Sequence, residues 1–64
     1  MNLIMVETHR QAYDHLRIEI LLRRVKLREI EGAGLPSPLE LIIEIEAFVR
    51  EAARLKQILG ELDD

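Results

Sequence analysis

The sequence predicts an all-α protein, an antiparallel two-helix hairpin whose helices pack along each other as in a coiled coil. Three observations support this: two long segments rich in Leu, Ile, Glu and Arg, one cluster of Gly and Pro between them, and heptad spacing of the apolar residues in both segments. We expect a single domain over residues 1–64, with a first helix over about 7–31, a turn over about 32–37 and a second helix over about 38–60.

The start of the first helix has two possible positions. Thr8 and Gln11 have the spacing of a capping box, which would begin the helix near residue 8. The apolar residues Leu3–Val6 could equally form an earlier helical turn. The sequence leaves this boundary open.

The turn is the clearest local signal in the chain. Gly32 or Gly34 can adopt the left-handed conformation that closes a helix C-terminus at little steric cost. Ser37 and Glu40 then have the spacing of a capping box, and Pro38 lies at the first helical position, where its missing N–H is no loss. We therefore expect one helix to end and another to begin within this segment.

A seam of residues spaced alternately three and four apart runs along each helix. In the second segment every seam position is apolar: Leu41, Ile45, Phe48, Ala52, Leu55, Leu59 and Leu62. In the first segment only a His and an Arg interrupt the seam, which comprises Val6, His9, Tyr13, Leu16, Ile20, Arg23, Leu27 and Ile30.

Folding the chain back at the turn brings the two seams into register. In an antiparallel hairpin, facing residues have numbers with a nearly constant sum, and here that sum is 71 or 72. The predicted layers are Ile30 with Leu41, Leu27 with Ile45, Arg23 with Phe48, Ile20 with Ala52, Leu16 with Leu55, Tyr13 with Leu59, and His9 with Leu62.

The two polar seam residues are expected to be structural. Arg23 could form a cation–π contact with Phe48 or receive a carboxylate of a partner protein. More often such an arginine lays its aliphatic stem on the ring and places its guanidinium in water, which is the arrangement we expect. His9 lies near the open end of the hairpin, where we expect a solvated or hydrogen-bonded ring.

A second set of apolar residues lies outside the seams. These residues, which we predict to form a protein interface, are Ile18, Leu21, Leu22 and Val25 in the first helix and Ile42, Ile43, Ala47 and Val49 in the second. One hairpin cannot cover both faces of its first helix, and soluble monomers seldom leave such a patch in water. We therefore expect association, either of two hairpins in a four-helix bundle or of one hairpin with a helix of another protein.

A basic cluster lies near the end of the first helix and is the candidate contact for nucleic acid: Arg23, Arg24, Lys26 and Arg28. The antiparallel register places Glu40, Glu44 and Glu46 alongside it, which favours charge compensation within the hairpin. The formal net charge of -3 also differs from the strongly basic character of general nucleic-acid coats. We do not expect nucleic acid to be the main partner.

The sequence contains no motif for catalysis, a cofactor or a metal. It has no Cys, no Ser/His/Asp set and no phosphate-binding Gly loop before a helix. His15 and Glu19 share a helix face, but two ligands do not make a metal site. We expect a protein that is not an enzyme and has neither a cofactor nor a metal.

The apolar runs are short. The longest run of large apolar residues, Leu3–Val6, is far below the about 20 residues that a membrane span requires. We expect no membrane partner and a cytoplasmic location.

A single core in a chain of 64 residues supplies only about 3–5 kcal/mol, so a second chain would add needed support.

Several helical-hairpin families resemble this chain. In length and in its single Gly/Pro break over residues 32–38, it resembles the small co-chaperones of type III secretion needle subunits and the plasmid RNA-binding hairpin that dimerises into a four-helix bundle. Residues 31–41 are similar to the turn of the exonuclease VII small subunit. Residues 34–49 resemble sporulation phosphatase hairpins, although Ile42 and Glu46 stand where that family has Ser and Asp.

Together these features predict a protein–protein interaction module: a small adaptor, co-chaperone or regulatory subunit that forms a homodimer or engages a helix of another protein. The alternative is a dimeric nucleic-acid-binding regulator of the kind represented by the plasmid RNA-binding hairpins.

Overall fold

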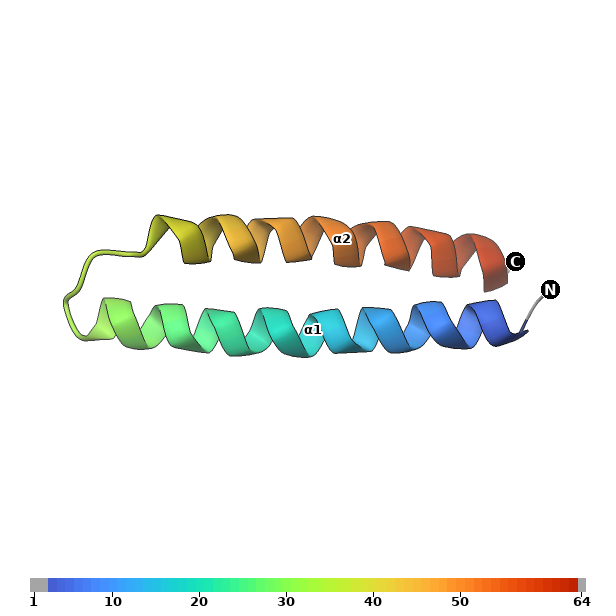
Figure 1. Ribbon diagram of the computed structural model, residues 1–64, viewed down its shortest axis with the longest axis horizontal. Helices are drawn as coiled ribbons and strands as arrows, with labels where there is room; N and C mark the ends of the chain where they lie inside the picture. The colour runs from blue at the N-terminus through green and yellow to red at the C-terminus, as the bar shows by residue number, and fades with distance from the viewer. Residues whose placement is uncertain (1–2, 64) are drawn as a thin grey trace.

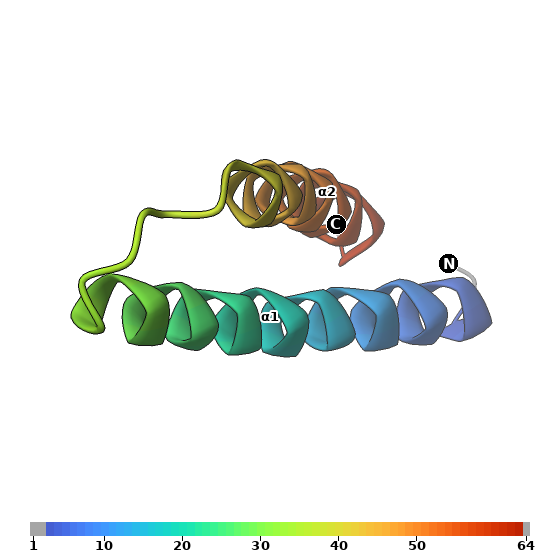
Figure 2. The same cartoon turned by 60° about the vertical axis from the view of Figure 1, so that its left-hand side comes forward.

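The computed structural model describes residues 3–63, with the side chains of residues 3–61, and consists of two helices. Helix α1 spans Leu3–Gly32 and helix α2 spans Leu39–Asp63. The helices lie side by side in opposite directions (Figure 1), and the molecule measures 50 × 14 × 14 Å. This confirms the predicted all-α hairpin. A second view shows that the helix axes cross at an angle (Figure 2).

Helix α1 begins earlier than the capping-box alternative requires. Its first residue is Leu3, so the apolar residues Leu3–Val6 form its first turn. Thr8 lies inside the helix, where its hydroxyl donates a hydrogen bond of 2.8 Å to the carbonyl oxygen of Ile4. A Thr within a helix commonly bonds to the carbonyl four residues earlier in this way.

A Schellman motif ends α1. The amide of Leu35 donates to the carbonyl of Ile30 at 3.2 Å, and the amide of Gly34 donates to the carbonyl of Glu31 at 3.0 Å. Gly34 has a φ of 77°, the left-handed conformation that an L residue with a Cβ avoids. Of the two glycines proposed from the sequence, Gly34 therefore turns the chain, whereas Gly32 is the last residue of α1.

Helix α2 begins one residue later than the capping box places it. The amide of Ile42 donates to the carbonyl of Pro38 at 3.2 Å, so Pro38 precedes the helix and does not occupy its first position. Among the hydrogen bonds of the described residues, none joins Ser37 to Glu40, and the predicted capping box does not form. At its other end α2 continues through Gly60 to Asp63, three residues beyond the predicted end.

The core is a narrow strip along the line where the helices meet. Its most buried side chains are all seam residues: Val6, Ile20, Ile45, Ala52 and Leu55. The remaining seam residues with described side chains are half-buried: His9, Tyr13, Leu16, Arg23, Leu27, Ile30, Leu41, Phe48 and Leu59. The side chain of Leu62, the predicted neighbour of His9, lies outside the described residues. The heptad pattern therefore identifies the packed side of both helices.

The prediction that no segment spans a membrane can be compared with the length and hydropathy of the two helices. Over residues 3–63, neither α1 nor α2 has a stretch long and apolar enough to cross a membrane.

Candidate interaction surface

The side of α1 that faces away from α2 carries four exposed aliphatic residues, which we name the back stripe. They are Ile18, Leu21, Leu22 and Val25, with exposed fractions of 57%, 62%, 59% and 44%. Each helical residue is rotated by about 100° from the one before it, so these residues cannot lie on the side that buries Ile20. Because α2 covers only the seam side, the back stripe stays in water.

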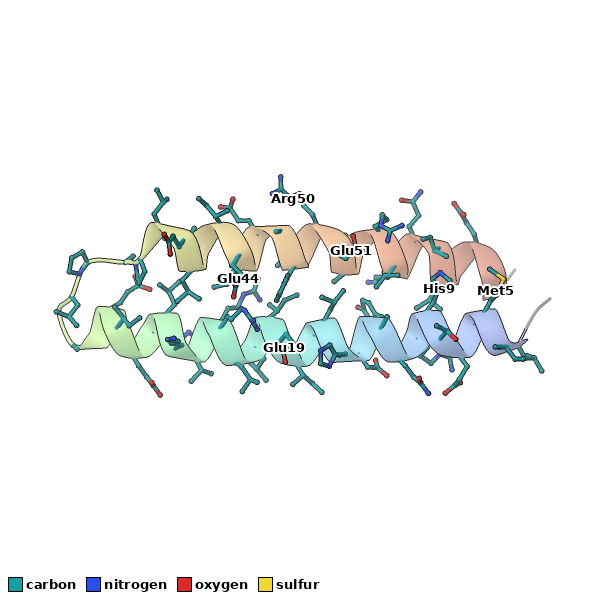
Figure 3. The ribbon with its side chains drawn as sticks, in the orientation of Figure 1. Met5, His9, Glu19, Glu44, Arg50 and Glu51 are labelled. Atoms are coloured by element: carbon teal, nitrogen blue, oxygen red, sulfur yellow. The ribbon has the colours of Figure 1, made fainter. Side chains whose placement is uncertain are left out.

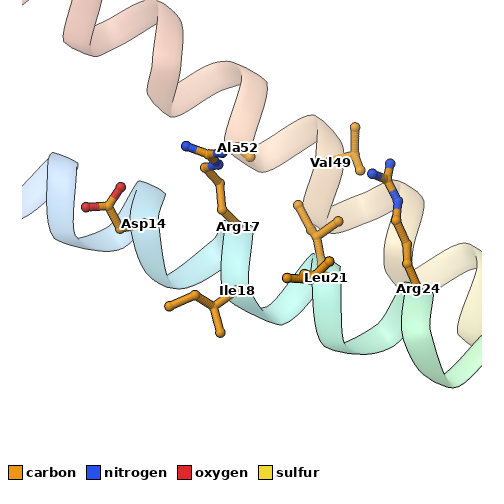
Figure 4. Close-up of a pocket in the computed structure, with 8 residues that line it drawn as sticks. Asp14, Arg17, Ile18, Leu21, Arg24, Val49 and Ala52 are labelled. Carbon is orange, nitrogen blue, oxygen red and sulfur yellow. The ribbon is translucent and has the colours of Figure 1, made fainter.

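An open groove of about 620 Å³ lies between the helices next to the back stripe. The residues that line it are Asp14, Arg17, Ile18, Ile20, Leu21, Arg24, Val49 and Ala52. Figure 4 shows Arg17 and Arg24 extending from α1 toward α2, on either side of Leu21. The groove therefore has an apolar floor, with Arg24 toward one end and Arg17 and Asp14 toward the other.

The four α2 residues predicted to form part of the interface do not share one surface. Val49 lines the groove and Ile42, seven residues earlier, is half-buried. Ile43, which is 53% exposed, lies two residues before the buried Ile45 and so projects from the opposite side of α2. Ala47 is exposed one turn after Ile43. The structure thus brings Val49 close to Ile18 and Leu21, and places Ile43 and Ala47 elsewhere.

Arg23 connects the two helices. It forms ion pairs with Glu19 of α1 and Glu44 of α2, and its guanidinium carbon lies 4.5 Å from the centre of the Phe48 ring. Figure 3 shows Glu44 on the side of α2 that faces α1. The predicted layer of Arg23 and Phe48 is confirmed. The expectation that the guanidinium is left to water is wrong, because two carboxylates bind it.

This network alters the acidity of its members. The hydrogen bond from Arg23 lowers the pKa of Glu19 below its ordinary value of 4.5. The hydrogen bonds to Glu19 and Glu44 raise the pKa of Arg23, which stays protonated at any physiological pH. A second pair on α2, in which Arg54 donates to Glu51, lowers the pKa of that glutamate.

The basic cluster that could contact nucleic acid is divided by the fold. Arg24 and Arg28 are four residues apart on one side of α1, whereas Lys26, two residues from each, projects from the other side. All three are exposed, and within residues 3–61 none of them forms an ion pair with a glutamate of α2. Among the residues whose side chains the structure describes, the charge compensation expected between the helices is therefore present only at Arg23.

Each histidine ring lies near a polar group of its own helix. The ring Nδ1 of His9 is 2.7 Å from the carbonyl oxygen of Met5, and the Nε2 of His15 is 3.9 Å from Glu19 Oε1. In the part of the chain that the structure describes, no group of three or more His, Cys, Asp or Glu side chains could hold a metal ion.

The groove that Arg17 and Arg24 line is a feature that the sequence interpretation missed. Arg17 and Arg24 are seven residues apart with Leu21 between them, a spacing that places all three on one side of a helix. The Arg17 guanidinium carbon also lies 5.7 Å from the centre of the Tyr13 ring, which directs the side chain along the seam. The heptad spacing was the available signal.

Comparisons with known proteins add no relative: no protein-family model, curated protein or solved structure matches this chain. The exposed apolar residues of the hairpin are therefore the main indication of its function.

Proposed function

We propose that this protein is a non-enzymatic interaction module that acts by self-association. Two hairpins associate into an assembly of four helices, and the apolar surface left outside the contact is offered to a helix of another protein. Such a protein would work as a small adaptor, co-chaperone or regulatory subunit.

The observation that carries this proposal is the back stripe. Four neighbouring aliphatic side chains stay 44–62% exposed on the longer helix, although the seam on the other side of that helix is packed. Contiguous apolar patches of this kind mark interaction sites in soluble proteins. The thin core of the hairpin supports the same conclusion, because a small domain without disulfides or a metal commonly gains stability from association.

The free energy gained by burying the back stripe is large enough for a dimer. Burying a fully exposed aliphatic side chain contributes about 1.5–3 kcal/mol, and these four residues are about half exposed. Eight such side chains in a dimer would therefore contribute about 6–12 kcal/mol before the loss of translational and rotational freedom is subtracted. A dimer in the micromolar range or weaker follows from these values.

The decisive experiment is a mass measurement in solution by sedimentation equilibrium, at about 1 μM to 1 mM protein, the range that corresponds to about 8–4 kcal/mol of binding free energy. The monomer has a mass of 7.4 kDa, and we expect the observed mass to rise toward twice this value with concentration. A constant mass of 7.4 kDa up to the highest concentration would contradict self-association.

Two matched variants locate the surface. Leu22 and Ile43 are similarly exposed, at 59% and 53%, but lie on different faces of the hairpin. Leu22→Asp should abolish the dimer and leave the circular dichroism of the dilute protein helical. Ile43→Asp should leave the dimer intact. Dimerisation of Leu22→Asp with the affinity of the original chain would exclude the back stripe as the interface.

A second candidate function, binding of RNA or DNA by the dimer, is favoured by one observation. The cations Arg24, Lys26 and Arg28 are exposed and, among the described residues, have no ion-pair partner. Their division between two sides of α1 weighs against a single basic stripe of the type that contacts phosphates.

A salt titration separates the two functions. A nucleic-acid-binding dimer should bind a labelled RNA or DNA at low salt, lose affinity steeply as salt is added, and lose it further in Arg24→Glu. Absence of binding at low salt would remove this candidate. A steep salt dependence that disappears in Arg24→Glu would remove the interaction module as the first choice.

A further inference from the structure

We propose that the back stripe is covered by a second copy of this chain, with the two α1 helices antiparallel about a two-fold axis that passes beside Leu21 and Leu22. This inference rests on the proposed function, because it specifies the geometry of the same self-association. A two-fold interface places the same surface of both copies face to face, so that residues equally far from the axis in opposite directions meet.

The first support is a row of three residues along one edge of the back stripe. Asp14, Leu21 and Arg28 are spaced by seven residues and therefore lie along one line of α1. An axis at Leu21 brings Asp14 of one copy opposite Arg28 of the second copy, and the symmetry repeats this pair. Within residues 3–61, neither Asp14 nor Arg28 has an ion-pair partner in its own chain.

A second row along the other edge has the same spacing. His15, Leu22 and Glu29 are also spaced by seven residues, so an axis at Leu22 brings His15 opposite Glu29 of the second copy. Between the two rows, Ile18 and Val25 are seven residues apart and centred on the same point, so each packs on the other across the axis. Asp meets Arg along one edge, Glu meets His along the other, and aliphatic residues meet in the middle.

The neighbouring groove lacks this complementarity. Arg17 and Arg24 are also seven residues apart, and both extend across the groove (Figure 4). A two-fold axis through the groove would bring Arg17 of one copy against Arg24 of the second, which is repulsive. The repulsion between these two arginines therefore favours the back stripe as the surface on which α1 meets its own copy.

The hairpin exposes more surface than a compact monomer of its mass. A compact monomer of this mass is expected to expose about 4200 Å², whereas the hairpin exposes 5055 Å². The excess of about 850 Å² is close to the about 800 Å² that each partner buries in an interface of standard size.

The test reverses charges at the two ends of the first row. Asp14→Arg alone brings like charges together at both symmetric positions, and so does Arg28→Asp alone. Each single variant should raise the dimer dissociation constant by about tenfold, because two surface pairs become repulsive. Mixing the two single variants should restore affinity, since every Arg then faces an Asp in the heterodimer. The double variant Asp14→Arg/Arg28→Asp should also dimerise like the original chain.

Glu46→Arg and Arg50→Asp provide matched controls, because both positions are exposed on α2, away from α1 (Figure 3 shows Arg50). These variants should keep the original dissociation constant, and their mixture should form no preferred heterodimer. Sedimentation equilibrium gives the constants, and native mass spectrometry identifies the heterodimer. Circular dichroism verifies that each variant is helical.

Each outcome decides a different point. Dimerisation of the original chain without any effect of the charge reversals would overturn this two-fold geometry and leave self-association standing. A chain that is monomeric at every concentration would overturn self-association itself, and with it this geometry.

Discussion

The guanidinium of Arg23 lies over the ring of Phe48, with 4.5 Å between the guanidinium carbon and the ring centre. The same side chain binds Glu44 of α2 and Glu19 of its own helix. A polar residue thus occupies a seam position with its charge paired, since its Nε donates to Glu44 and its Nη1 donates to Glu19.

This arrangement predicts that Arg23→Lys lowers the stability of the hairpin. Lysine keeps the charge, but its ammonium cannot lie flat on the ring while binding two carboxylates. Arg24→Lys is the matched control, because Arg24 is exposed and has no ion pair within the described residues. In urea unfolding followed by circular dichroism, we expect a lower midpoint for Arg23→Lys and an unchanged midpoint for Arg24→Lys. Equal midpoints would show that the contacts of the Arg23 guanidinium contribute nothing measurable to the stability of the hairpin.

The lowered pKa values of Glu19 and Glu51 predict that stability decreases in acid. Because each pKa is lower in the folded chain than the ordinary value of 4.5, these glutamates stabilise the fold above pH 4.5. This contribution is lost as the pH falls below 4.5 and passes through the folded-state values. Unfolding midpoints measured from pH 7 to pH 2 should therefore fall less steeply for the double variant Glu19→Gln/Glu51→Gln. An equally steep fall would mean that other carboxylates cause the acid sensitivity.

The packing of the core predicts that replacing Leu with Ala lowers stability far more at a buried position than at an exposed one. Leu55 is 6% exposed, and Leu55→Ala should cost about 2–5 kcal/mol. Since the whole hairpin has only about 3–5 kcal/mol from its core, most of the chain should unfold at low concentration. Leu22→Ala, at a position 59% exposed, should leave the dilute protein folded. Circular dichroism at about 1 μM, where dimers are scarce, compares the two. Equal losses of helix would mean that the seam is misassigned.

The Schellman motif predicts opposite effects for two glycines. Gly34 has a φ of 77°, so Gly34→Ala should cost about 1–2 kcal/mol, although nothing lies within 4 Å of the added methyl group. Gly32 is helical and equally uncrowded, and Gly32→Ala should stabilise the hairpin by about 0.5–1 kcal/mol. For a domain of this size 1 kcal/mol shifts Tm by about 4–8 °C. A rise in Tm for Gly34→Ala would contradict the turn geometry.

The helices and their packed sides follow from the sequence alone. Heptad spacing is a local property: residues such as Ile20 and Leu55 lie on the seam of any helix that contains them, and the Gly/Pro cluster permits only one place to turn. For this reason the hairpin and the pairing of Arg23 with Phe48 could be predicted. The back stripe was also visible, because a helix with two apolar sides has one that its own hairpin cannot cover.

The tertiary structure decided the partners of charged groups and the surfaces that residues share. Whether Glu44 binds Arg23, and whether Val49 lies beside Leu21 while Ile43 does not, depends on how the helices are rotated and crossed. The number of apolar residues in a segment does not show which of them share a surface, because side chains close in sequence project from a helix in different directions. Gly34 was likewise selected over Gly32 by the hydrogen bonds that close α1, which form only when the chain has turned.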